Sequence, residues 1–79
     1  MTVRLDIGDY IYEYRRGNVV DIRCRKILEV GRNIQGSWVL VSGDTWDIKI
    51  HESDICVNSR SCWHGYFTSQ EAAEGCRYA

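Results

Sequence analysis

The 79-residue chain contains no proline. Its turns must therefore be built from Gly, Asn, Asp and Ser, which reach turn conformations through positive φ or through local side-chain hydrogen bonds. The chain also lacks any run of even ten apolar residues, so the sequence predicts no membrane-spanning helix. Its first residues lack a basic segment followed by an apolar core, so we expect no secretory signal and a cytoplasmic location.

An excess of charge of one sign is missing as well, because the formal net charge is −1. Dedicated nucleic-acid-binding proteins usually carry a clear basic excess, so the overall charge does not favour that class. The charges are nevertheless unevenly placed. Basic residues concentrate between positions 15 and 32, and acidic residues dominate positions 44–54. A local basic patch is compatible with this distribution.

The length and composition predict one small folded domain over residues 1–79. A domain of this size buries only about 60–65% of the surface that its unfolded chain exposes, so its stability margin is thin. Hydrophobic residues make up 44% of the chain and charged residues 27%. Both fractions are ordinary for globular proteins, which argues against disorder. No internal repeat or linker is present.

Alternation of apolar and polar residues predicts several short strands. They cover residues 1–7, 10–15, 19–30, 37–42 and 45–51, with a short addition near Ile55 and Val57. Residues 31–36 and 58–65 are expected to be loops. In the strand 45–51, Trp46, Ile48 and Ile50 are predicted to face the core, because side chains alternate between the two faces of a strand.

The segment 19–30 is the longest predicted strand, and its alternation is imperfect. One face is expected to bury the apolar residues Val20, Ile22, Cys24, Leu28 and Val30. The opposite face then carries Asp21, Arg23, Arg25 and Glu29. Lys26 and Ile27 break this pattern, which predicts a bulge or sharp bend at residues 25–27.

A helix is predicted near the end of the chain. The sequence Thr68-Ser-Gln-Glu71 fits a capping box, in which Thr68 is the N-cap residue and Glu71 reaches back to it. The helix should run from about Ser69 to Cys76, with Ala72, Ala73 and Cys76 on its buried side. A helix this short is not stable alone and must pack on the sheet.

Together these elements predict a mainly β (α+β) fold. The expected form is a small, strongly bent antiparallel sheet or an SH3-like barrel of about five strands, with one short C-terminal helix. An open α+β sheet with the helix lying across one face is the alternative. An unpaired edge strand would be exposed unless the barrel closes or two chains pair their edges, so a homodimer is a further prediction.

Three cysteines and one histidine raise the hypothesis of a zinc site. Cys56, Cys62, His64 and Cys76 are suitable ligands, but their spacing lacks the tight Cys pair that typically preorganises two thiolates. Free core thiols and a surface histidine are the preferred interpretation, so no metal or other cofactor is predicted. Cys62 and His64 are also close enough in sequence for nucleophilic catalysis. So short a chain leaves little room for a substrate cleft, and we expect no enzyme.

Tyrosine, arginine and tryptophan supply the candidate binding residues. Tyr10, Tyr12 and Tyr14 are expected to share one strand face, near Arg23 and Arg25 of the next strand, and Trp63 lies in a polar loop. Such residues anchor protein interfaces, and they also stack bases and hold phosphates in oligonucleotide-binding barrels. Alternatively, the tyrosines are core residues and the arginines only keep the surface soluble.

Three segments carry a resemblance to a known group of proteins. They are Gly8-Asp-Tyr-Ile-Tyr-Glu-Tyr14, Val19-Val-Asp-Ile-Arg-Cys-Arg-Lys-Ile27 and Tyr66-Phe-Thr-Ser-Gln-Glu-Ala-Ala73. In this order they resemble short phage and prophage accessory proteins with a small SH3- or KOW-like domain and a Y-F-T-S-x-E-x-A motif at the final helix. Ala72 stands where that motif often has a second Glu, and residues 56–65 have no counterpart.

The resemblance implies a non-enzymatic, phage-derived binding protein that inhibits or sequesters a host component, as anti-CRISPR and other anti-defence proteins do. It transfers no catalytic residues. The expected partner is a host protein or protein complex, with Tyr10, Tyr12, Tyr14, Arg23, Arg25 and Trp63 as the candidate contacts. A nucleic-acid- or nucleotide-binding domain and a small zinc-stabilised module are the alternatives, and no membrane partner is expected.

Overall fold

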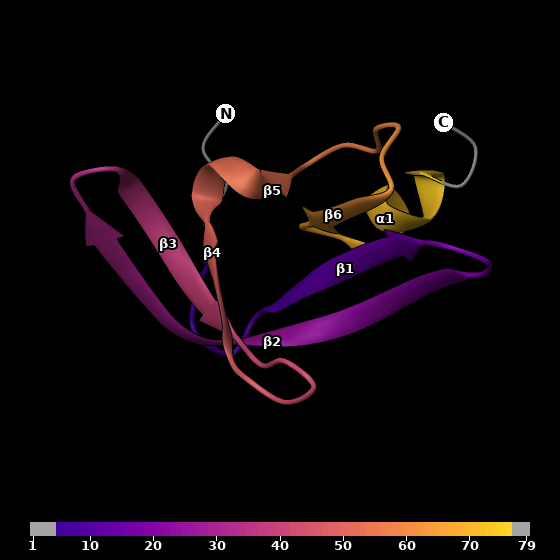
Figure 1. The fold of residues 1–79 in the computed structure, drawn as a ribbon. Helices are drawn as coiled ribbons and strands as arrows, with labels where there is room; N and C mark the ends of the chain where they lie inside the picture. The colour runs from indigo at the N-terminus through magenta and orange to yellow at the C-terminus, as the bar shows by residue number, and fades with distance from the viewer. Residues whose placement is uncertain (1–4, 77–79) are drawn as a thin grey trace.

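The computed structural model describes residues 5–76 and is mainly β (Figure 1). Its elements are β1 (Tyr10–Arg16), β2 (Val20–Asn33), β3 (Gly36–Val41), β4 (Ile48–His51), the 3₁₀ turn η1 (Glu52–Asp54), β5 (Ile55–Cys56), β6 (His64–Phe67) and α1 (Gln70–Gly75). The predicted class, mainly β with one short C-terminal helix, is confirmed. No helix of the described residues is long and apolar enough to cross a membrane.

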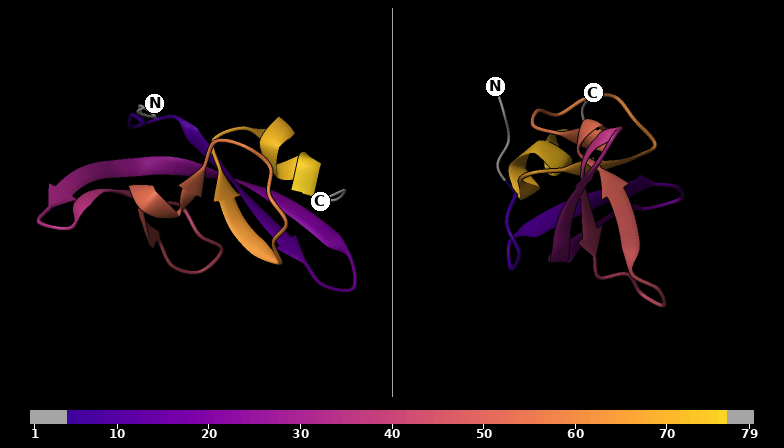
Figure 2. Two further views of the ribbon diagram at one scale, coloured as in Figure 1. Left: turned by 90° about the horizontal axis from the view of Figure 1, so that it is seen from above. Right: turned by 90° about the vertical axis from the view of Figure 1, so that its left-hand side faces the viewer.

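All six strands belong to one sheet in the order β4-β3-β2-β1-β6-β5. Neighbouring strands are antiparallel except β5 and β6, which are parallel. The edge strands β4 and β5 are separated in sequence only by the three residues of η1, which span at most ~10 Å. The sheet therefore curls into a half-barrel (Figures 1 and 2). Its edges do not pair with each other within residues 5–76, and the homodimer stays a prediction.

The long strand β2 makes this curl. It pairs with β1 along its first half and with β3 along its second half. The register shifts between Ile27 and Glu29, so Leu28 is the extra residue of a bulge. A bulge bends the strand and increases its twist. A bend was expected at residues 25–27, and the structure has it at Leu28, immediately after that segment.

Apolar side chains form two clusters on opposite faces of the sheet. On the inner, concave face the buried residues are Ile11, Ile27, Val39, Val41 and Ile50. On the outer face they are Tyr14, Phe67, Ala72, Ala73 and Cys76, beneath α1. Figure 2 shows α1 on one side of the sheet while the β3–β4 hairpin curls to the other. The predicted burial of Ala72, Ala73 and Cys76 is confirmed.

The prediction of which β2 side chains are buried is wrong. Arg25 and Ile27 are its buried residues, whereas Val20 and Cys24 are exposed. Arg25 lies opposite Ile11 on β1, and directly opposite residues share a face, so Arg25 points into the concave side. The outer face of β2 is left partly exposed because the six-residue α1 covers only part of it.

Several predicted boundaries also differ from the structure. Residues 1–4 of the strand predicted at 1–7 lie outside the described residues, and residues 5–7 are not a strand. The loop predicted at 31–36 is shorter, because β2 continues to Asn33 and β3 begins at Gly36. The loop predicted at 58–65 ends where β6 begins at His64.

The strand predicted at 45–51 begins only at Ile48, and Trp46 is 80% exposed in the loop before it. This loop is tight: a Cβ atom on Gly43 would lie 1.9 Å from the Trp46 carbonyl oxygen. Asp44 of the same loop is paired with Arg23 and Arg25. These contacts turn the chain away from the core before Trp46 and override the alternation pattern.

Ser69, not Thr68, caps α1. The Ser69 hydroxyl accepts a hydrogen bond from the Ala72 amide at 3.1 Å. The third residue after this cap is Ala72 and not Glu71, so the predicted capping box does not form. Both residue types are good N-caps, and the strand β6 decides between them by extending the chain to Phe67.

Ser69→Ala is expected to lower the free energy of unfolding by about 1 kcal/mol, because it removes the acceptor of an N-terminal helix amide. Thr68→Ala is the matched control and should cost clearly less. Urea unfolding followed by tryptophan fluorescence measures both. A larger loss of unfolding free energy for Thr68→Ala than for Ser69→Ala would contradict Ser69 as the N-cap residue.

Gly31 is required by an aromatic side chain across the β2–β3 pair. It lies opposite Trp38, and a Cβ atom on Gly31 would lie 2.2 Å from Trp38 Cζ2. The Lys49 ammonium lies 4.5 Å from the centroid of the same ring. The indole is thus fixed between the glycine backbone and a cation on the outer face.

Gly31→Ala is expected to destabilise the fold by about 1–3 kcal/mol, because the new methyl group must displace the Trp38 ring. Gly17→Ala is the matched control, since no atom lies within 4 Å of a Cβ there and its φ is not in the left-handed region. Urea unfolding of the two variants tests this. Equal stabilities would contradict the packing of Trp38 on Gly31.

Candidate functional site

The predicted contact residues do not form one surface. Tyr10, Tyr12 and Tyr14 lie on the outer face, where Tyr14 is fully buried, Tyr12 is half-buried and Tyr10 is 49% exposed. Arg23 and Arg25 lie on the inner face, because they pair with residues 13 and 11 of β1. The predicted proximity of these arginines to the tyrosines is therefore not observed.

The two arginines instead belong to a network of ion pairs. Arg25 is only 5% exposed, and its Nε and Nη2 atoms donate to Oε1 of Glu13 at 3.0 and 2.8 Å. Its Nη1 atom donates to Asp44 at 3.0 Å. Arg23 also pairs with Asp44, and with Asp21 at 2.8 Å. The hydrogen bond to Asp44, with the charge of Glu13, raises the pKa of Arg25, so this guanidinium stays charged.

Glu13 is the centre of this network and is only 1% exposed. Its second oxygen, Oε2, accepts from His64 Nε2 at 2.6 Å and from Arg15 Nε at 3.1 Å. Burial by itself raises the pKa of Glu13, but the hydrogen bonds from His64 and Arg25 and the nearby guanidinium charges hold it below its ordinary value. Because an ionised carboxylate only accepts, Nε2 of His64 carries the hydrogen.

Tyr66 of β6, which lies directly opposite Glu13, is also close to this carboxylate. Its ring meets that of His64 edge-on, with centroids 5.1 Å apart. Burial and the negative charge of Glu13 raise the pKa of Tyr66, so its hydroxyl stays protonated near neutral pH. Glu13 and Tyr66 together fix the orientation of His64.

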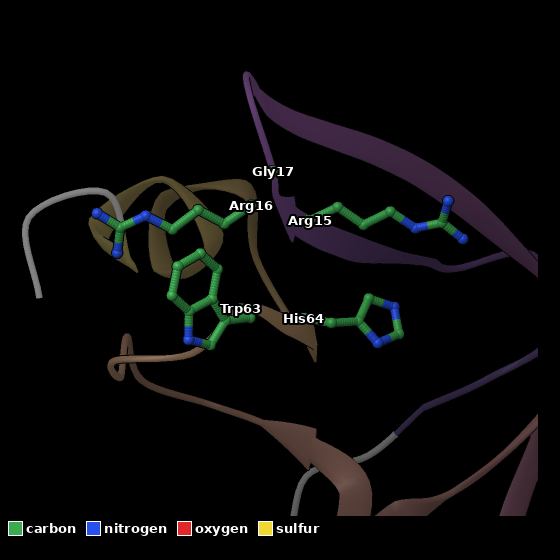
Figure 3. Close-up of a pocket in the computed structure, with 5 residues that line it drawn as sticks. All are labelled: Arg15, Arg16, Gly17, Trp63 and His64. Carbon is green, nitrogen blue, oxygen red and sulfur yellow. The ribbon is translucent and has the colours of Figure 1, made fainter.

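A wide hollow lies where β1 ends and β6 begins (Figure 3). Its volume is about 520 Å³, and it is lined by Arg15, Arg16, Gly17, Trp63 and His64. Arg15 lies directly opposite His64, and the Arg16 amide donates to the Trp63 carbonyl oxygen at 2.7 Å. Figure 3 shows Arg15 and His64 extending to one side of the strand pair and Arg16 and Trp63 extending to the other.

We call Arg15, Arg16, Trp63 and His64 the Trp63 surface. Trp63 is 73% exposed, yet the Arg16 guanidinium lies 5.5 Å from the centroid of its ring. The Arg15 side chain is 53% exposed, and among the described ion pairs it uses only Nε. The hollow is therefore bordered by a restrained indole and the Arg16 guanidinium on one side, and by the Arg15 guanidinium and an imidazole on the other. This set is suited to binding an anionic group beside an apolar one.

The sequence indicated Trp63 as a recognition residue but missed its partners. In the sequence, Arg15 and Arg16 stand out only as part of a basic segment, and His64 stands out only as a candidate zinc ligand or as a neighbour of the Cys62 thiol. The signal that identifies them is positional. A pair of arginines followed by Gly17-Asn18 ends a strand at a hairpin turn, and an antiparallel neighbour then brings Trp63 and His64 beside it.

The four residues of the zinc hypothesis do not converge. Cys62 and Cys76 lie together on the outer side, with sulfur atoms 3.8 Å apart, whereas His64 is bonded to Glu13 on the inner side. Cys56 packs against the same outer cluster as the two thiols. Within residues 5–76 no group of three or more Cys, His, Asp or Glu side chains is arranged to hold a metal ion.

Comparisons with protein-family models, with curated proteins and with solved structures found no match.

Glu13→Gln is expected to lower the free energy of unfolding at neutral pH by about 3 kcal/mol, because it leaves the buried Arg25 charge with Asp44 as its remaining partner. Glu29→Gln, on an exposed residue of β2, is the matched control and should change stability by less than about 0.5 kcal/mol. Urea unfolding measures both. Similar values for the two variants would contradict the central position of Glu13.

The lowered pKa of Glu13 also predicts that the stability of the protein depends on pH. The pKa of Glu13 is lower in the folded state than its ordinary value of 4.5. Its contribution to stability is therefore fully present above that value, and it is lost as the pH falls through the folded-state pKa. As the pH falls below 4.5, the wild type should lose more stability than Glu13→Gln. Parallel pH profiles of the two proteins would contradict the assignment.

Proposed function

We propose that this protein is a non-enzymatic binding protein that docks a partner through the Trp63 surface. The observation that supports this most directly is that Trp63 is 73% exposed while its ring lies under Arg16. A restrained side chain loses less conformational entropy when it is covered. Tryptophan and arginine are also the residue types that contribute most binding energy at protein interfaces.

The partner that this surface fits is an acidic segment of another protein. Arg15 and Arg16 line the hollow and extend to its two sides, and guanidinium groups suit bidentate binding of Asp or Glu side chains. Glu13 neutralises part of the charge of Arg15 from the buried side, but the Arg15 side chain is 53% exposed and its Nη atoms make no ion pair with the described part of the chain. Trp63 supplies the apolar contact.

A role as a phage-derived inhibitor that sequesters a host component agrees with this type of surface. Such an inhibitor acts by occupying a site on its target, which requires contact residues and no catalytic group. The resemblance of residues 8–14, 19–27 and 66–73 to phage accessory proteins supports that role. The host protein would be bound in the cytoplasm in a stoichiometric complex.

Nucleic acid or a nucleotide is the second candidate, because Trp63 with Arg16 could stack one base while Arg15 contacts a phosphate. Two observations favour a protein partner. Of the tyrosines expected to extend the stacking surface, Tyr14 is fully buried and Tyr12 is half-buried against the cluster beneath α1. Arg23 and Arg25 are paired with carboxylates on the other face. A single aromatic ring gives a poor platform for a strand of several nucleotides.

Affinity capture from nuclease-treated host lysate tests this proposal with three immobilised proteins. Wild type and Trp46→Ala should retain the same protein, because Trp46 is an equally exposed tryptophan on a different loop. Trp63→Ala should retain it at least ~10-fold less, as expected for loss of an interface anchor. Equal retention by Trp63→Ala would contradict the proposal.

A second arm separates the two kinds of partner. Labelled single-stranded DNA or RNA is titrated with the wild type at low and at moderate salt. Binding that falls steeply with salt and is lost in Trp63→Ala would favour the nucleic-acid candidate. No shift at low salt, together with Trp63-dependent protein capture, supports the acidic protein segment.

A further inference from the structure

Two of the four cysteines touch one another beneath α1. The sulfur of Cys62, which lies just before β6, is 3.8 Å from the sulfur of Cys76, the C-cap residue of α1. Both thiols are free. Cys76 is fully buried, whereas Cys62 is partly exposed. A reagent in solution can therefore reach Cys62 directly, whereas Cys76 is not exposed to it.

The chain segment that carries Cys62 is already docked on α1. The Ser59 hydroxyl donates to the Ala72 carbonyl oxygen, and the Arg60 amide donates to the Cys76 sulfur at 3.4 Å. A Cβ atom on Gly75 would lie 2.0 Å from Ser59 Oγ, so the helix and the segment approach as closely as a glycine allows. These contacts hold the two thiols next to each other in the folded protein.

The remaining cysteines are placed differently. Cys24 is exposed on the outer face of β2, and no other thiol lies in contact with it among the described residues. Cys56 is in β5, where its backbone is fixed by pairing with Phe67. Within residues 5–76, Cys62 and Cys76 are the one pair of thiols in contact.

We propose that Cys62 and Cys76 are a modification site that forms an intramolecular disulfide when the protein meets a small-molecule disulfide of the glutathione class. The bond joins the residue preceding Trp63 to the C-terminal end of α1. The proposal rests on the thiol geometry and not on the binding function, so it can fail or succeed independently of that function.

The reaction balances as two thiol–disulfide exchanges. The Cys62 thiolate attacks one sulfur of oxidised glutathione, forming a mixed disulfide and releasing one glutathione thiolate. The Cys76 sulfur, once deprotonated, then attacks Cys62 Sγ and releases the second glutathione. The protein loses two hydrogen atoms, and the glutathione disulfide is reduced to two thiols. Reduced glutathione in excess reverses both steps.

Two consequences follow from the position of the bond. Burial raises the pKa of the Cys62 thiol, so the reaction should accelerate as the pH rises and the thiolate fraction grows. The bond also closes the loop between residues 62 and 76. Such a crosslink should raise the ratio of folded to unfolded protein by about 100-fold, because it restricts the unfolded chain.

The experiment treats the full chain with oxidised glutathione, traps free thiols by alkylation and maps the cysteines by mass spectrometry. Trypsin alone leaves Cys62 and Cys76 in one peptide. Added cleavage after glutamate separates them into residues 61–71 and 75–77, while Cys56 falls in residues 53–60. A crosslinked pair of 61–71 with 75–77 is the expected product.

Two variants and a stability measurement complete the test. Cys24→Ser should leave the crosslink and the gain in urea resistance unchanged, whereas Cys62→Ser should abolish both. Peptides 61–71 and 75–77 that remain alkylated while Cys24 carries glutathione would overturn the proposal. A crosslink from Cys62 to Cys56, or a lasting glutathione adduct on Cys62, would overturn it as well.

Discussion

The buried ion pair between Glu13 and Arg25 is the constraint on which the rest of this structure depends. An unpaired charge in either position would be strongly unfavourable, so each must hold its partners. Glu13 binds groups from β1, β2 and β6, and Arg25 extends the network to Asp44 in the β3–β4 loop. One carboxylate thereby joins β1, β2 and β6 on the concave side and orients His64.

The curl of the sheet and the position of the Trp63 surface follow from the same arrangement. The bulge at Leu28 lets β2 serve both halves of the sheet, and the charged network fills the concave side beyond the cluster around Ile11 and Ile27. The outer side needs only the short helix α1 to cover Tyr14 and Phe67. Arg16 and Trp63 extend from the end of this strand pair, where nothing in the described chain covers them.

Local sequence pattern predicts where the secondary-structure elements lie, but it does not predict which face of a strand is buried. Most strands, a bend in the longest strand and the C-terminal helix could be predicted because they depend on local residue pattern; the bend itself lies at Leu28, just after the predicted residues 25–27. The burial of Arg25 could not, since its main partner Glu13 is twelve residues earlier in the chain. The prediction that Trp46 faces the core is wrong, because the ion pairs of Asp44 hold the loop that carries Trp46 away from the core. The cap was assigned to Thr68 because Ser69 is an equally good cap residue and β6 was not foreseen.

A double-mutant cycle between Glu13 and Arg25 tests the central claim most directly. The free energies of unfolding of the wild type, Glu13→Gln, Arg25→Met and the double variant are measured by urea unfolding at neutral pH. The account predicts strong coupling: the double variant should be more stable than the sum of the two single losses implies, by about 1–3 kcal/mol. Losses that add to within about 0.5 kcal/mol would mean that the two charges act independently, and would contradict the account.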